Sequence, residues 1–426
     1  MKNAPLLLNH CSELYRQWEK LRGTGKPADE IRRAYFRERH YLGSRDRRFI
    51  DLLFYDMIRN LRLYEWQIRR EREDISGAVP AALLTVHAFL RRFPDEAETA
   101  RYEIADDLAQ YASVHRYRDI YPEAPEIRES MPDMVWERIR THYSPSELEK
   151  CLTALNTPAE VHLRVNTRKI SPPEFMRSCK DLPLRPGNIS PDALRMNRHT
   201  DLTQHPFFKR GLFELQDESS QLVAFACRPK DGDTVIDLCA GAGGKTLHLA
   251  ALQGENGALI ATDIHADRLE RLDRRAKRAG VRERIRILPL ETVRRQYRDR
   301  ADILLIDAPC TGSGVFRRNP DSKWTLSGEI LAFCLNEQAN LLRENAALVK
   351  PGGKLVYATC SIIPDENEKQ IEAFLADHSG FSLMSVSDEL KSSGIPLPGS
   401  GSGMLSVLPH HYDSDGFFIA VLTRGK

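Results

Sequence analysis

The sequence predicts a helical first part, a short mixed α+β segment and a C-terminal α/β domain with a doubly wound, mostly parallel sheet. Nearly continuous apolar runs are typical of strands covered on both faces of such a sheet. Regular alternation of these strands with helical segments, such as 265–279 and 328–348, predicts the doubly wound arrangement. The candidate strands are 234–240, 258–263, 285–289, 301–309, 354–360 and 416–424.

The first part of the chain, to about residue 125, has helical rather than strand periodicity. Apolar residues such as Leu52, Leu53, Met57, Leu61 and Leu63 recur at near-helical spacing. The stretch 81–93 is a second apolar segment of helical character, and Pro80 stands near its start, where proline is well tolerated. We therefore expect a small all-helical domain at the N-terminus.

The middle of the chain mixes helix and strand patterns. Prolines interrupt 117–134, which we interpret as a linker. The segment 161–167 alternates apolar and polar residues as a half-buried strand does, and two prolines then precede a helix. The predicted domains are 1–128, 129–212 and 213–426.

Composition excludes several classes of protein. The chain has 426 residues, is 41% hydrophobic and 29% charged, and carries a net charge of +2, as an ordinary globular protein does. Its eight cysteines include no C-x-x-C pair, so neither a metal site nor a disulfide framework is expected. No apolar run approaches the roughly 18 residues of a membrane helix, and the N-terminal start is too short for a signal peptide. We expect a cytoplasmic protein.

Two arginine-rich stretches stand out, 31–48 and 268–300. Clustered arginines can hold phosphate groups. The alternative is a solvated, ion-paired helix face, and a single stretch does not decide between the two. Two such stretches flanking an α/β core favour a polyanionic substrate.

A glycine-rich turn, DLCAGAGGKT (237–246), follows the first predicted strand and opens a helix. Glycines let a ligand approach the backbone, and a helix N-terminus favours negative charge. The glycine spacing differs from that of a P-loop, which argues against a nucleoside triphosphate. Asp263 ends the next strand, where an acidic residue can bind a ribose. A tight turn with a helix cap is the alternative interpretation, but it leaves Asp263 unexplained.

Two more strand ends carry reactive side chains. Asp307 and Cys310 end the strand 301–309, and Cys360 ends the strand 354–360. Ligands of such sheets bind at the carboxyl ends of the strands, so two thiols and a carboxylate are expected around the cofactor. One such cysteine would be interpreted as buried packing. A pair of cysteines at this edge favours a catalytic role for them. It also argues against NAD as the cofactor, although the glycine turn alone would allow NAD.

The motifs CAGAGGKT, DAPCTGSGVFRRNPDSKW and YATCSIIPDENE together resemble those of the Sun (Fmu), RsmB-type family of RNA cytosine-5 methyltransferases. The run YFRERHYLGSRDRRFIDLLFYDMIR resembles the helical NusB-like, RNA-binding domain of the family's bacterial 16S rRNA member. The resemblance covers essentially the whole chain. It implies a Rossmann-like class I methyltransferase sheet, an RRM-like α+β segment and a NusB-like domain. Two departures are Gly241 and Ala242 in place of Ala-Pro, and Glu291 where the family has Asp.

The resemblance also implies S-adenosyl-L-methionine as cofactor and a covalent mechanism. Cys360 would add as a thiolate to carbon 6 of cytosine, and Cys310 would assist release of the adduct. Asp307 would bind the cytosine edge or the cofactor, with Lys245 near the reacting base. DNA cytosine-5 methyltransferases use the cysteine of a Pro-Cys motif, so the residues alone do not rank the two cysteines. The implied cofactor contacts are Cys239, Ala240, Gly241, Ala242, Gly243, Gly244, Lys245, Asp263 and Asp307.

The expected partner is 16S rRNA or the assembling small subunit, bound by a monomer. Arg317, Arg318 and Lys323 are predicted to contact phosphates, and Trp324 either stacks on a base or packs in a core. The target base must be unstacked, so a loop or distorted segment is expected. Three alternatives are a transfer RNA methyltransferase, a non-catalytic ribosome assembly factor and an adenine-amino methyltransferase. The last class carries Asn/Asp-Pro-Pro-aromatic where this chain has DAPC, and both thiols argue against the assembly factor.

Overall fold

The computed structural model describes residues 4–93, 119–197, 201–395, 397 and 403–426. The chain forms two compact units, which are described separately. Unit 1 comprises Met1–Thr157 together with Phe316–Ser327, and unit 2 comprises Pro158–Val315 and Gly328–Lys426. The division differs from the predicted bounds at 128 and 212. The helices just after residue 128 pack with unit 1, and residues 316–327, much later in the chain, also belong to unit 1.

Unit 1 is built from helices, as predicted. Leu53, Met57, Leu61 and Leu63 are buried in its core, together with large aromatic side chains such as Trp18, whereas Leu52 is 39% exposed. The apolar spacing therefore marks the inward face of each helix. The helices are α1 (Ala4–Leu21), α2 (Ala28–Arg37), α3 (Ser44–Arg59), α4 (Leu61–Glu71), α5 (Ala81–Arg92), α8 (Pro125–Arg128), α9 (Asp133–Ile139) and α10 (Pro145–Leu155).

The predicted linker 117–134 is wrong in its described part. Pro125 and Pro132 begin short helices, because proline suits the first positions of a helix. Ser130 Oγ accepts a hydrogen bond from Leu63 N at 3.0 Å, and Met131 O accepts one from Arg62. These bonds fix the segment to α4. Residues 117 and 118 lie outside the described residues.

A small antiparallel sheet opens unit 2. Its strands are β1 (Val161–Val165), β2 (Arg185–Pro186), β3 (Ala193–Met196) and β4 (Phe213–Leu215), in the order β2-β3-β1-β4. Helices α11 (Pro172–Ser178) and α12 (Pro206–Lys209) lie between strands in the sequence. Ser171 caps α11 through a hydrogen bond from Glu174 N, directly before the two prolines. This strand order confirms the RRM-like segment.

The large sheet has the order β10-β12-β9-β8-β5-β6-β7, with β11 paired to β12. Strands β7, β6, β5, β8 and β9 are parallel, whereas β12 is antiparallel to β9 and β10 is antiparallel to β12. The order confirms the Rossmann-like class I methyltransferase sheet. The strands are β5 (Thr234–Asp237), β6 (Ala258–Ala261), β7 (Ile285–Ile287), β8 (Ala301–Asp307), β9 (Val349–Thr359), β10 (Phe381–Met384), β11 (Leu405–Val407) and β12 (Phe417–Arg424).

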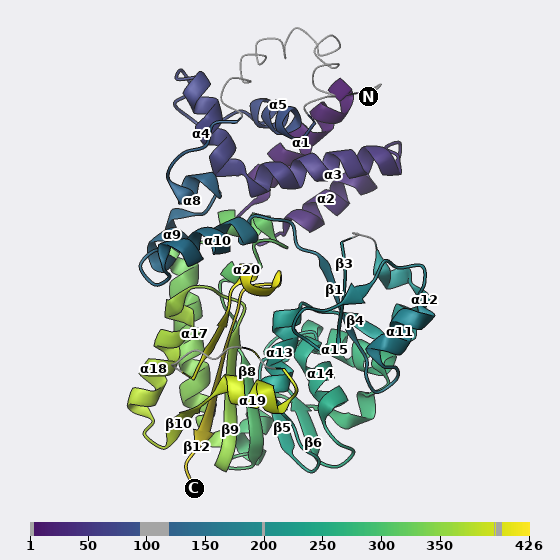
Figure 1. Cartoon of the computed structure of the whole chain (residues 1–426), viewed down its shortest axis with the longest axis vertical. Helices are drawn as coiled ribbons and strands as arrows, with labels where there is room; N and C mark the ends of the chain where they lie inside the picture. Colours follow the sequence, from purple (N-terminus) through teal and green to yellow (C-terminus); the bar gives the residue numbers. More distant parts are fainter. Residues whose placement is uncertain (1–3, 94–118, 198–200, 396, 398–402) are drawn as a thin grey trace. The chain divides into compact units, whose positions relative to one another are not determined.

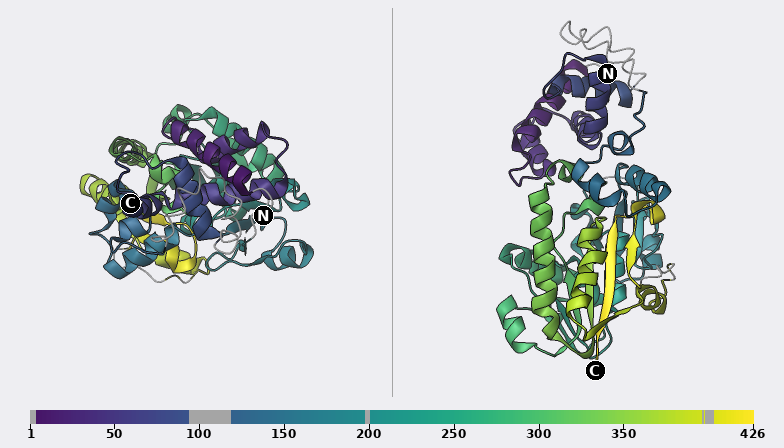
Figure 2. Two further views of the ribbon diagram at one scale, coloured as in Figure 1. Left: turned by 90° about the horizontal axis from the view of Figure 1, so that it is seen from above. Right: turned by 90° about the vertical axis from the view of Figure 1, so that its left-hand side faces the viewer.

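Helices cover both faces of this sheet (Figures 1 and 2). Alternate strand residues enter two clusters: Val235 and Leu305 pack with α13, α14, α15 and α19, whereas Ile236 and Ile306 pack with α16, α17 and α18. Burial on both faces explains the nearly continuous apolar runs. The helices are α13 (Glu218–Cys227), α14 (Gly244–Leu252), α15 (Ala266–Ala279), α16 (Leu290–Gln296), α17 (Gly328–Asn345), α18 (Glu368–Asp377), α19 (Val386–Ser392) and α20 (Pro409–Tyr412).

The helices within the described part of the chain include none that is both long and apolar enough to cross a membrane.

Candidate active site

The glycine turn joins β5 to α14 at the carboxyl end of the large sheet. Gly241 and Gly243 have φ angles of 52° and 86°, which strain any residue that carries a Cβ atom. A Cβ atom on Gly243 would also lie 2.7 Å from Cγ of Leu272, because α15 packs directly against the turn. Ala240 N donates to Thr262 O at 2.9 Å, and Ala242 O accepts a hydrogen bond from Arg275 at 2.6 Å. The turn is therefore held in one shape.

The surroundings of the turn fit the predicted cofactor. A Cβ atom built on Gly241 or Gly244 meets no other atom within 4 Å, so open space lies beside the turn. Asp263, just after β6, accepts hydrogen bonds from Gly241 N at 2.9 Å and from His265 N at 2.8 Å. Exposed glycine backbone next to a carboxylate suits the amino-acid part and the ribose of S-adenosyl-L-methionine.

Lys245 and Asp307 form an ion pair in the middle of the site. Nζ of Lys245, in the first turn of α14, lies 2.6 Å from Oδ2 of Asp307, the last residue of β8. It also lies 4.9 Å from the ring centroid of Phe417. Burial lowers the pKa of Lys245, but Asp307 and then Cys360 raise it more, so the pKa lies above its usual value. Lys245 is thus a fixed positive charge near Cys360.

The two strand-end cysteines lie together, with 3.5 Å between the sulfur atoms of Cys310 and Cys360. Both are partly exposed. Their strands β8 and β9 are neighbours in which Asp307 pairs with Ala358, so the two loops leave the sheet side by side. A hydrogen bond of 2.9 Å from Gly314 N to Cys360 O joins the loops again. The geometry thus brings two thiols to a single point beside a lysine.

The thiols differ in their surroundings. The hydrogen bond with Cys360, followed by burial, raises the pKa of Cys310 well above its ordinary value. Cys310 therefore holds a proton at neutral pH. Burial likewise raises the pKa of Cys239 well above its usual value, and this thiol packs against the apolar core. Of the three cysteines at the carboxyl edge, Cys360 has the Lys245 ammonium as its charged neighbour.

Glu291 lies in the first turn of α16, just after β7. Its side chain is 84% exposed and its carboxylate is 3.4 Å from Arg294. The position is at the carboxyl edge of the sheet, where the cofactor adenine is expected. Whether Glu291 contacts adenine stays a prediction.

The structure gives two of the predicted phosphate contacts a different role. Arg317 and Lys323 are 2% and 1% exposed, inside unit 1. Lys323 Nζ donates to Asn156 Oδ1 at 2.6 Å, Ser130 O at 3.2 Å and Arg59 O at 3.3 Å, and these acceptors all belong to unit 1. A buried ammonium with these acceptors is unable to reach a phosphate. Arg318 is partly exposed, so its phosphate contact stays a prediction.

Trp324 follows the packing alternative. Its Nε1 donates to Ile58 O at 2.7 Å, and its ring packs against the core of unit 1. The sequence reasoning treated 316–327 as an extension of the DAPC motif. The segment instead belongs to unit 1, and its basic and aromatic side chains serve that unit.

The arginine-rich stretches differ from each other. In 268–300, many of the charges are paired within unit 2: Arg271 with Asp267, and Arg275 and Arg278 with Glu214. This pattern fits the ion-paired face. In 31–48, exposed arginines remain in unit 1, namely Arg33, Arg37, Arg45 and Arg48. Phosphate binding by this first stretch stays a prediction.

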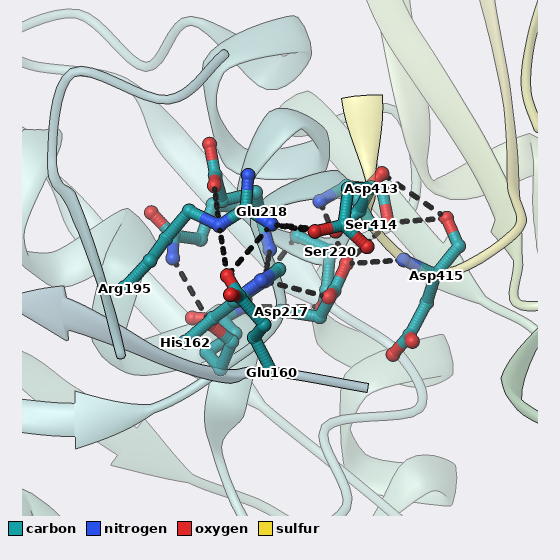
Figure 3. Close-up of polar contacts among 12 residues, drawn as sticks. Glu160, His162, Arg195, Asp217, Glu218, Ser220, Asp413, Ser414 and Asp415 are labelled. Carbon is teal, nitrogen blue, oxygen red and sulfur yellow. Dashed lines mark hydrogen bonds and ion pairs between the residues drawn. The ribbon is translucent and has the colours of Figure 1, made fainter. Parts of the chain in front are cut away.

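A buried charge network surrounds the N-terminus of α13 (Figure 3). Asp217 caps α13 by accepting from Ser219 N at 2.9 Å, and it also accepts from Asp415 N at 3.1 Å. His162 lies 2.8 Å from the Asp217 carboxylate. The fully buried Arg195 contacts three carboxylates, those of Glu160, Glu218 and Asp413. The network connects the small sheet, α13 and the turn before β12.

The same turn reaches the loop after Cys310. Gly416 N donates to Gly314 O at 2.8 Å, and a Cβ atom on Gly314 would lie 2.2 Å from Gly416 O. Only glycine fits such a close approach of two backbones. The charge network and this backbone contact therefore fix one side of the Cys310 loop.

Sequence reasoning missed Glu366 and Asn367, which are both buried beside the two cysteine loops. They belong to the quoted YATCSIIPDENE motif, six and seven residues after Cys360. Their place at the end of a motif was the one feature of the sequence that pointed to these two polar residues. A loop has no periodicity that distinguishes buried from exposed positions, so their burial could not be predicted.

Comparisons with known proteins agree on one family. A family model described as 16S rRNA methyltransferase RsmB/F matches residues 224–423, and one described as an RsmF/B-like, ferredoxin-like domain matches 131–203. The probable ribosomal RNA small subunit methyltransferase B of Synechocystis sp. is 32% identical over 418 residues, covering 91% of this chain and 93% of the relative. Ribosomal RNA small subunit methyltransferase B of Salmonella typhi is 31% identical over 363 residues, covering 83% and 76%.

Solved structures show the same fold. The crystal structure of PH0851 superposes with a TM-score of 0.75 at 26% identity and covers 99% of both chains. NSun6 from Pyrococcus horikoshii, crystallised with SFG, gives a TM-score of 0.62 at 22% identity, covering 70% of this chain and 99% of that one.

Proposed function

Because the chain belongs to the RsmB/F family of 16S rRNA methyltransferases, we propose that it forms 5-methylcytosine in 16S rRNA through a covalent bond between Cys360 and the target base. Methyl transfer to ribosomal RNA from S-adenosyl-L-methionine is the activity of this family. The proposal goes beyond this family activity in two respects: the methylated atom, carbon 5 of cytosine, and the covalent role of Cys360.

One observation carries the covalent mechanism: two thiols lie 3.5 Å apart at the carboxyl end of the sheet, next to a lysine. Methyl transfer to an oxygen or an amino group has no use for a cysteine pair. Carbon 5 of cytosine does, because it is a weak nucleophile until a thiolate has added at carbon 6. Lys245, held by Asp307, places a positive charge beside Cys360.

The reaction then proceeds in four steps. Sγ of the Cys360 thiolate forms a bond to C6. The electron pair of the 5,6 double bond moves onto C5, which becomes nucleophilic. C5 then forms a bond to the methyl carbon as the bond from that carbon to the donor sulfur breaks, and the sulfur keeps the electron pair and leaves uncharged. S-adenosyl-L-methionine, which the glycine turn and Asp263 would hold, would supply this methyl group. A base removes the proton from C5, the double bond returns, and Cys360 leaves as a thiolate. Cys310, whose protonated sulfur lies 3.5 Å from that of Cys360, assists the release step by donating a hydrogen bond to the leaving sulfur.

The cofactor is held by the glycine turn and Asp263, and the base is held by Asp307 and Lys245. The base must leave its stack to reach a site at the end of the sheet strands. A loop or a distorted segment of 16S rRNA is therefore the expected target. Exposed arginines of 31–48 are the candidates for holding the RNA backbone.

The test is methylation of 16S rRNA by the full-length protein, with bisulfite mapping of the product. We expect one protected cytosine with the wild type and none with Cys360→Ser, while the Cys360→Ser variant still binds S-adenosyl-L-methionine. Transfer RNA serves as the competing substrate. Retained turnover by Cys360→Ser would refute the covalent role. Preferential methylation of transfer RNA would refute the substrate, and a wild type that binds RNA without any transfer would favour the assembly-factor alternative.

A further inference from the structure

A fully buried carboxylate lies against both cysteine loops, and no step of the proposed reaction uses it. Glu366 ends the short turn Pro364–Glu366, which leads into α18. Its Oε1 accepts hydrogen bonds from Thr311 N at 2.8 Å and from Gln338 Nε2 at 3.1 Å. Its Oε2 accepts from the hydroxyl groups of Thr311 and Ser361. The two carboxylate oxygens thus accept from four donors.

The partners of Glu366 are the immediate neighbours of the two reactive sulfurs. Thr311 directly follows Cys310, and Ser361 directly follows Cys360. The first loop continues from β8 and the second from β9, and Glu366 lies further along the second loop, five residues after Ser361. One side chain therefore fixes two independent loops relative to each other, at the residue next to each sulfur.

Asn367 adds a second hold on the Cys360 loop. Thr359 Oγ1 donates to Asn367 Oδ1 at 2.5 Å, and Asn367 Nδ2 donates to Ser361 O at 2.9 Å. The residues on either side of Cys360 are thus bound to one amide. The hydroxyl groups of Ser313 and Ser361, 2.9 Å apart, link the loops once more. Buried networks in which each member has partners are rigid.

We propose that Glu366 is a positioning residue which, together with Asn367, sets the short distance between the sulfurs of Cys310 and Cys360. Its importance for turnover rests on the proposed function, because that reaction places both thiols at a single cytosine. The effect of Glu366 on the distance between the two sulfurs is independent of the proposed function. A reacting group displaced by about 1 Å loses roughly 100-fold in rate.

The sulfur separation can be measured without RNA or cofactor. Phenylarsine oxide bonds to two thiols at once with release of water, which requires the sulfurs to be close. We expect the full-length wild type to bind one equivalent at this pair, and Cys310→Ser and Cys360→Ser each to lose it. Glu366→Ala should weaken this binding by roughly tenfold or more, as the loops lose their common partner.

Two variants separate geometry from charge and from stability. In Glu366→Gln, the amide group can donate to the hydroxyls of Thr311 and Ser361, which can also accept, so phenylarsine oxide binding should stay within about twofold of wild type. The matched control is Glu389→Ala, which removes another buried carboxylate of unit 2, one that pairs with Lys354 in the middle of β9. It should leave both phenylarsine oxide binding and kcat unchanged.

Turnover gives the second readout. Glu366→Ala should lower kcat by roughly 100-fold, with little change in KM for RNA or in the Kd of S-adenosyl-L-methionine. Wild-type phenylarsine oxide binding in Glu366→Ala would overturn the proposal, as would an equal loss in Glu389→Ala. If Glu366→Ala does not fold, Glu366→Asp, too short to reach both loops, takes its place under the same criteria. If phenylarsine oxide behaves as expected but the wild type never methylates cytosine, the proposed function fails and the positioning role stands.

Discussion

Replacement of Lys323 by methionine tests the role that the structure gives to this residue. The ammonium is buried in unit 1 and donates to Asn156 Oδ1, Ser130 O and Arg59 O. Methionine fills much of the same space but leaves these three acceptors without a donor. Burial lowers the pKa of Lys323 well below its ordinary value, so the ammonium itself is costly to bury and its removal offsets part of the loss.

The expected cost is about 3 kcal/mol, from roughly 1 kcal/mol for each of three buried acceptors, the low end of the usual range. Unit 1 has about 170 residues, and a protein of this size loses roughly 2–4 °C in Tm for each kcal/mol. Lys323→Met should therefore lower the Tm of unit 1 by about 10 °C. Calorimetry of the full chain measures this shift, and hydrogen exchange of α3 and α10 localises it.

The control is Lys369→Met, since Lys369 is 63% exposed and pairs with Asp365 one helical turn earlier. It should change stability by less than about 0.5 kcal/mol. A Lys323→Met protein as stable as this control would refute the structural role. The opposite pattern, normal stability with the salt dependence of RNA binding reduced by one phosphate contact, would restore the phosphate role predicted from the sequence.

Three further outcomes are expected. Cys310→Ala should accumulate a covalent protein–RNA adduct that survives a denaturing gel; normal turnover without an adduct would remove its role in release. Asp263→Ala should weaken binding of S-adenosyl-L-methionine by roughly tenfold or more in calorimetric titration, with the Tm of the free protein nearly unchanged. Burial lowers the pKa of His248 from 6.5 to about 4. The unfolded chain therefore binds more protons between these values, and stability is lost as pH falls from 6.5 to 4, by about 3 kcal/mol in all; His248→Gln should show a flatter pH profile of unfolding free energy.

The parts of the site that the sequence predicted best are those defined by local pattern. Asp263, Asp307 and Cys360 each follow an apolar strand, and the carboxyl ends of parallel strands meet at one edge of the sheet. Gly241 and Gly243 are required by their positive φ angles, which a strand–turn–helix pattern anticipates. Strand β12 was also predicted, whereas the short strands β10 and β11 were not, because three or four residues carry too little periodicity.

The parts that failed depend on contacts between distant segments. Arg317 and Lys323 looked like phosphate ligands because basic residues after a catalytic motif are usually exposed. Their burial follows from the packing of 316–327 with helices more than 150 residues earlier in the chain. Glu366 escaped notice for a similar reason: its four donors come from three separate segments. No local pattern in the sequence records where those segments meet.

The late segment Phe316–Ser327 also has a consequence for how the chain is made. A ribosome delivers residues 1–157 first, but the core of unit 1 lacks Lys323 and Trp324 until 167 more residues, 158–324, have been synthesised. At about 5–20 residues per second, that interval is roughly 8–30 s. During this interval, Arg59 O and Asn156 Oδ1 lack their donor Lys323, and Ile58 O lacks its donor Trp324. The first unit to leave the ribosome is thus completed only when the centre of the second has been translated.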